Sequence, residues 1–240
     1  MTTQATQATQ ATQATQLDVN ASQENNSPAI KQSQKQKSRP VLVRSVNLNS
    51  LYAQRVFKRC FTPVSRSLFA IDVVLRNSFA EEADMKNITE AVDTVLGQTS
   101  ESFDKTTDQL DQMTSNAGLQ LDDAAFSYSN PDAKEAQLTT PAAARFLNLI
   151  LRLDAVVSKI DYLWFNSVID SAVKNNAAYE WQQMLIKAAG QITSIEQRAR
   201  RMASEKGDGG KLDEMAPVNE DTDHNEATDA ELAAGEEVVA

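Results

Sequence analysis

The side chains most able to do chemistry are concentrated in one basic region of the sequence. Ten Lys and Arg residues and a single acid, Asp72, fall between Lys31 and Arg76. The segments beyond it are acidic: residues 81–123 hold eleven acids against two lysines, and residues 205–240 hold twelve against two. The formal net charge of −10 therefore hides a basic region: residues 1–204 hold 21 basic and 21 acidic residues, so the whole negative excess lies in the C-terminal segment. Such a region is the electrostatic footprint of a surface that binds phosphates or an acidic partner.

Few residues offer enzymatic chemistry. The one histidine, His224, falls in the acidic C-terminal segment, so neither a folded histidine-based triad nor a metal cluster is expected. The glycines form neither a phosphate-binding loop nor a dinucleotide fingerprint. Cys60 falls on an apolar helix face, where a buried and inert thiol is expected rather than a nucleophile. The sequence therefore predicts that the protein is not an enzyme and binds no cofactor and no metal.

A short β-strand is expected at residues 41–48 (VLVRSVNL), inside the basic region. The segment is rich in β-branched residues and roughly alternating. The alternation puts two sets of side chains on opposite faces: Arg44, Val46 and Leu48 on one, and Val43, Ser45 and Asn47 on the other. Arg44 thus shares a face with apolar residues. Either it reaches water from the edge of the strand, or the register differs from this one. Asn49 or Ser50 can then cap a helix.

Helices are expected over most of the remaining foldable segment, residues 39–204. The first has an apolar face from Ala53 to Val64, and Pro63 is expected to begin a second, over about 64–79. Further helices are expected over about 81–115, 140–169 and 176–203, with Gly118 as a stop and Thr140-Pro141 as a start. Residues 119–139 are expected to be a loop or short hairpin. Arg145, Arg152 and Lys159 recur every seven residues as one polar stripe.

The predicted fold class is mainly α, a helical domain with a short N-terminal β-strand between two disordered tails. Residues 1–38 form a low-complexity arm, residues 39–204 the helical domain, and residues 205–240 an acidic tail. Apolar residues at heptad spacing in the last helix are typical of coiled-coil packing. The tail can serve solubility alone, or it can cover the basic region and lower non-specific DNA binding.

The basic region itself has two interpretations. It can be a linker followed by an ordinary solvated helix face, or it can bind DNA. The near-absence of acids, and a strand that leads straight into a basic helix, favour DNA. Such a strand, paired with its twin across a dimer, forms a ribbon that reads the major groove. The candidate DNA-binding residues are Arg39, Arg44, Ser45, Asn47, Arg55, Lys58 and Arg59, of which Arg44, Ser45 and Asn47 lie on the strand.

Compartment signals are few. A single cysteine fits a reducing cytosol. The N-terminus does not read as a secretory signal, and no run of eighteen apolar residues is present, so no membrane partner is expected.

Three segments resemble the AcaB-type family, formerly a domain of unknown function, of transcriptional regulators from conjugative plasmids and integrative conjugative elements. They are RPVLVRSVNLNSLYAQRVFKRCF, TTPAAARFLNLILRLDAVVSKIDYLWFNSVID and AAYEWQQMLIKAAGQITSIEQRARR, within about residues 40–203. The resemblance implies a DNA-binding regulator with a ribbon-helix-helix-like element, active as a homodimer in the bacterial cytoplasm and nucleoid-associated when bound. RNA polymerase or another regulator would be a further partner.

The favoured hypothesis is therefore a regulator, most simply an activator, of conjugative transfer genes that binds double-stranded DNA as a dimer. The alternative is a non-enzymatic helical interaction protein of a conjugation or plasmid-maintenance system that does not bind DNA. In that case the basic stripe contacts an acidic protein.

Overall fold

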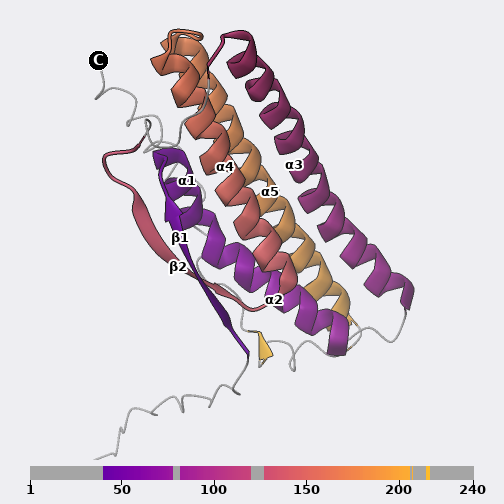
Figure 1. Ribbon diagram of the computed structural model, residues 1–240. Coiled ribbons are helices and arrows are strands. Elements are labelled where there is room, and N and C mark those ends of the chain that lie inside the picture. Colours follow the sequence, from indigo (N-terminus) through magenta and orange to yellow (C-terminus); the bar gives the residue numbers. More distant parts are fainter. Residues whose placement is uncertain (1–39, 78–81, 120–126, 206, 208–214, 217–240) are drawn as a thin grey trace, which may run out of the picture. The chain divides into compact units, whose positions relative to one another are not determined.

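Helices supply most of the structure (Figure 1). The structure is a computed structural model that describes residues 40–77, 82–119, 127–205, 207 and 215–216, all of them within one compact unit. The elements are β1 (Leu42–Leu48), α1 (Leu51–Val56), the π-helical turn η1 (Phe57–Phe61), α2 (Thr62–Asn77), α3 (Glu82–Asn116), β2 (Asp132–Leu138), α4 (Pro141–Phe165) and α5 (Ser171–Glu205). The predicted class, mainly α with a strand near the N-terminus, is confirmed. The predicted arm and most of the predicted acidic tail lie outside the described residues.

Helix α4 is the centre of the hydrophobic core. It contacts α1, α2, α3, α5 and β2, and Leu147, Ile150, Leu153 and Leu163 are completely buried. Thr140 caps its first turn by accepting a 3.2 Å hydrogen bond from the backbone N–H of Ala143. A helix that is apolar on most sides is expected to be covered by neighbours, and α4 is.

The polar stripe of α4 binds α3. Because its three basic residues recur every seven positions, they lie on one side of the helix, where an acidic row of α3 runs alongside. The ion pairs are Arg145–Asp93, Arg152–Asp104 and Lys159–Asp111. Their carboxylates are more than half exposed, so each pair contributes little stability by itself. Their sequence positions show that α3 and α4 run side by side in the same direction over this length.

Helices α1 and α2 are joined without a break through η1, which corrects the prediction of a new helix at Pro63. Proline lacks an N–H and its ring clashes with the carbonyl four residues earlier. A π-helical turn widens the backbone at that point and lets the helix continue. The expected apolar face is confirmed, because Ala53, Val56, Cys60 and Val64 are buried.

The start of α5 and the end of α3 each have a local physical cause. Helix α5 begins at Ser171, five residues before the expected cap at Asn176, because the carboxylate of Asp170 accepts a 2.8 Å hydrogen bond from the N–H of Val173. Helix α3 ends at Asn116, just before the expected stop at Gly118, whose φ of 68° lets the N–H of Leu119 bond back to the carbonyl of Thr114 at 3.1 Å.

The prediction of a loop or short hairpin over residues 119–139 missed the strand β2. Residues 132–138 (DAKEAQL) contain no β-branched residue and several good helix formers. Their extended conformation comes from pairing with β1, which lies about ninety residues earlier in the chain.

Candidate nucleic-acid interface

Strands β1 and β2 form an antiparallel ribbon. Its register runs from Leu42 opposite Leu138 to Leu48 opposite Asp132, and within the described residues the sheet has these two strands. The partner of β1 in this sheet is therefore a segment of the same chain, where the sequence had suggested a second copy. Figure 1 shows the ribbon lying along the side of the bundle opposite α3.

One side of the ribbon packs on the bundle. Val46 and Leu48 of β1 are buried, as are Ala136 and Leu138 of β2. The other side, which we call the outer face, is exposed along both strands. It consists of Val43, Ser45 and Asn47 from β1 and of Ala133, Glu135 and Gln137 from β2. Ser45 lies opposite Glu135, and Val43 opposite Gln137.

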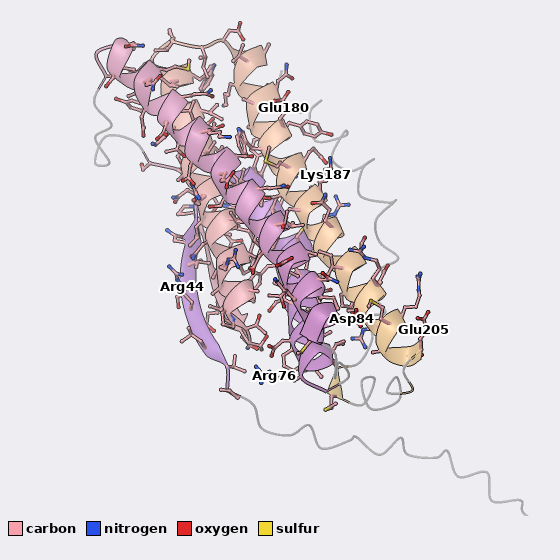
Figure 2. All side chains as sticks on the ribbon, turned by 90° about the vertical axis from the view of Figure 1, so that its right-hand side faces the viewer. Arg44, Arg76, Asp84, Glu180, Lys187 and Glu205 are labelled. Carbon is pink, nitrogen blue, oxygen red and sulfur yellow. The ribbon has the colours of Figure 1, made fainter. Side chains whose placement is uncertain are left out.

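The structure separates Arg44 from Ser45 and Asn47. Arg44 projects on the packed side of the ribbon with Val46, and its Nη1 donates a 3.0 Å hydrogen bond to Oδ1 of Asn148 on α4. The residue is exposed, so the guanidinium reaches solvent from the edge of the strand, which was one of the two expected placements. Figure 2 shows Arg44 on β1 at the margin of the bundle.

Two buried acids of α4 hold the ribbon in place. The carboxylate of Asp154 accepts hydrogen bonds from the backbone N–H of Ser50 at 2.6 Å and of Asn49 at 3.0 and 3.2 Å, at the corner between β1 and α1. Asp161, two turns later, accepts a 2.6 Å hydrogen bond from the hydroxyl of Tyr128 and pairs with Lys174 at 3.1 Å. Burial, and then the bond to Asp161, raise the pKa of Tyr128.

The corner between β1 and α1 has its own local bonds. Ser50 caps α1 by accepting a 3.3 Å hydrogen bond from the N–H of Ala53, which settles the choice left open between Asn49 and Ser50. The side-chain amide of Gln54 donates to the carbonyl of Leu48 at 3.0 Å and to that of Asn130 at 3.2 Å. Gln54 therefore joins the end of β1 to the segment that leads into β2.

The predicted basic helix residues follow directly on this corner. Lys58 is exposed, and Arg55 and Arg59 are half-buried, so all three have surface that a ligand could reach. Arg66 on α2 is also exposed. We call these four residues the basic face. Arg39, the seventh predicted site residue, lies outside the described residues.

Three observations bear on other kinds of site. Burial raises the pKa of the Cys60 thiol to about 11, as expected for an inert cysteine. Among the described residues, no three His, Cys, Asp or Glu side chains gather in a way that could hold a metal ion. In the same part of the chain, no helix combines the length and the apolar character needed to cross a membrane.

Sequence reasoning missed Glu135 and Gln137. The signal that could have found them is the alternation of Lys134 to Leu138, in which Ala136 and Leu138 turn inward, just before the helix start at Thr140. Alternation over so few residues is a weak signal until a partner strand is known.

The comparisons with known proteins agree with this geometry. A crystal structure of selenomethionine-containing AcaB from uropathogenic E. coli is 39% identical in sequence to this chain, with a TM-score of 0.71, over 75% of this chain and 91% of that one. This chain belongs to the AcaB family. The resemblance inferred from the sequence is thereby confirmed, and the AcaB fold extends over most of the described unit. No family model and no curated protein matches the sequence.

Proposed function

We propose that this AcaB-family chain is a sequence-specific DNA-binding transcriptional regulator, an activator of conjugative transfer genes in the bacterial cytoplasm. The observation that carries the proposal is the outer face of the ribbon. It presents Ser45, Asn47, Glu135 and Gln137 to solvent, and it leads directly into the basic face.

The dimensions and the side-chain types both fit the major groove of DNA. Two strands about 4.8 Å apart enter a groove about 12 Å wide. Asn47 and Gln137 can each make paired hydrogen bonds to adenine, and Glu135 can accept from the amino group of cytosine. Ser45 can contact several bases. The four side chains lie on one exposed surface, so they can be used at the same time.

The basic face supplies contacts that do not depend on sequence. Lys58 on η1 and Arg66 on α2, about two turns apart, are both exposed and are suited to phosphate oxygens. Such contacts release counterions, so the affinity should fall steeply with salt. They would orient the ribbon in the groove while its outer face reads the bases.

The free edge of β1 supports the proposal of a homodimer. Within the described sheet β1 pairs along one edge only, and an unpaired edge is a template for another strand. Beside it, Val41, Leu42 and Val43 are 45%, 65% and 54% exposed. We assign this apolar edge to a second copy of the chain. Two copies joined there would each present one outer face, one to each half of a two-fold symmetric site.

The test is binding to a promoter fragment of a conjugative element against a scrambled duplex, across a salt series. Asn47→Ala and Gln137→Ala should each lower the preference for the promoter by about 1–3 kcal/mol, which is roughly 5- to 150-fold. Lys58→Ala should weaken binding to both duplexes alike and reduce the salt slope by about one. Lys187→Ala, on the exposed surface of α5 (Figure 2), is the matched control and should change neither. Absence of duplex binding at low salt would refute the proposal.

A second candidate function is an interaction module that does not bind DNA. The negative charge of Glu135 and the apolar Val43 on the outer face favour a protein partner. Glu135→Gln separates the two: it should change base preference in a DNA-binding protein, whereas an interaction module should show no duplex binding with either residue.

A further inference from the structure

The acidic C-terminal segment is attached to the folded unit at a definite point. Ala216 is 4% exposed, and its carbonyl accepts a 2.7 Å hydrogen bond from Nη2 of Arg200. Met215 packs against the hydrophobic core, and Arg200 is also paired with Glu196. The acidic segment that leaves this point, residues 217–240, has eight acids and no Lys or Arg.

This attachment point lies close to basic residues. Both views place the segment 215–216 at the end of the unit where α2 and α5 finish (Figures 1 and 2). Arg198 and Arg201 are exposed on the last turns of α5, on either side of Arg200. Helix α2, which packs along α5, leads from this end back to the basic face.

The charges elsewhere on the unit direct an acidic chain toward the same side. Helix α3 is acidic, with eight acids and two lysines among residues 82–116, and it would repel residues 217–240. The three bases of α4 are already paired with Asp93, Asp104 and Asp111 of α3. Exposed basic side chains occur instead at Arg198 and Arg201 on α5 and at Lys58 and Arg66 of the basic face.

The length of the segment is sufficient. A flexible chain of 24 residues has a typical end-to-end distance of roughly 25–30 Å. The 16 residues of α2 span about 24 Å. Residues 217–240 can thus reach from Ala216 to Lys58, and tethering gives them an effective concentration in the millimolar range.

We propose that residues 217–240 dock on the basic face and compete there with the phosphates of DNA. This inference rests on the proposed function. The contact between Arg200 and Ala216 fixes the residue after which this competing segment begins. Competition divides every DNA affinity by the same factor, so weak non-specific complexes are lost while specific ones persist.

The first experiment measures binding of four forms of the protein to a scrambled 20-base-pair duplex. They are the full chain, a truncated form that ends at Ala216, a neutralised form in which the eight acids of residues 217–240 are replaced by Asn and Gln, and a shuffled form in which the order of residues 217–240 is changed. Truncation after Ala216 preserves the contact with Arg200. Both the truncated and the neutralised forms should bind about tenfold or more tightly than the full chain at 50 mM salt, and the difference should shrink at 300 mM. The shuffled form, with its charge intact, should behave as the full chain.

The outcomes separate this inference from the proposed function. If the full and truncated chains bind the duplex equally at 50 mM salt, the inference is wrong and the proposed function stands. If neither binds, both are wrong. Tighter binding by the truncated form but not by the neutralised form would also overturn the inference, because charge would then not be the cause.

A second measurement detects docking without DNA. A spin label on Ala230→Cys can be attached selectively, because the native thiol of Cys60 is buried. At 50 mM salt the label should broaden the backbone amide signals of Lys58 and Arg66, and at 500 mM salt the broadening should disappear. Sharp signals at both salt concentrations would contradict the proposal.

Discussion

Asp154 gives a sharp test of how the bundle holds the ribbon. Its carboxylate is buried, with 5% exposure, and accepts hydrogen bonds from the N–H groups of Asn49 and Ser50. In Asp154→Asn the amide keeps the size of the side chain, but only one of its two heavy atoms can accept. The variant loses the negative charge and leaves one backbone N–H facing another donor. A hydrogen bond to a charged group contributes about 1.5–3 kcal/mol, and an unsatisfied buried donor costs about 1–3 kcal/mol.

We therefore expect Asp154→Asn to lower the free energy of unfolding by about 2–4 kcal/mol, and Tm by about 5–15 °C for a domain of this size. The assay is urea unfolding followed by circular dichroism, with an unchanged m-value as the check that one transition is observed. Asp104→Asn is the matched control. Its carboxylate also meets a partner, Arg152, but the side chain is 65% exposed, so the loss should stay below about 1 kcal/mol. Equal urea midpoints for the two variants would refute the reasoning.

Three further predictions concern other parts of the molecule. Leu42→Asp, at a side chain that is 65% exposed beside the free edge of β1, should convert a dimer to a monomer in sedimentation velocity. The control Phe165→Asp, at a side chain that is 66% exposed at the C-terminal end of α4, should leave the dimer intact. Cys60, whose pKa is raised to about 11 by burial, should resist a thiol reagent at pH 8 until urea unfolds the protein. Between about pH 9 and 11 the thiol ionises in the unfolded state but not in the folded state, so the free energy of unfolding should fall as pH rises. Phe103→Leu, which removes a buried ring stacked 4.5 Å from Trp181, should cost about 1–2 kcal/mol in urea unfolding, and no measurable loss would contradict that role for the stack.

Local signals in the sequence predicted most of the helices. Thr140-Pro141 marks the start of α4 because a capping hydroxyl and a proline each satisfy a requirement of the first turn. Gly118 marks the end of α3 because glycine adopts a positive φ without strain. The boundary at Pro63 was wrong for a related reason. A proline signal gives the missing N–H, but not whether the preceding turn can widen to keep the helix continuous.

The candidate site was predictable only in part. Ser45 and Asn47 could be placed on one face of a strand from alternation alone, and both lie on the outer face. Glu135 and Gln137 could not be placed there, because their position depends on the long-range register with β1. A slip of one residue would turn both inward. Arg44 shows the same limit: its face was correct, but its partner on α4, Asn148, is 104 residues away.

The closure of the ribbon within one chain changes what a dimer would contribute. If a second copy supplied the partner strand, a monomer would have no reading surface at all. Here Ser45, Asn47, Glu135 and Gln137 already share one face in a single chain. Dimerisation would then add a second half-site, and with it affinity, rather than create the surface. Leu42→Asp should consequently still prefer a single half-site over a scrambled duplex, while losing the gain in affinity from two correctly spaced half-sites. If the monomeric variant shows no base preference, the ribbon of one chain is not the reading unit.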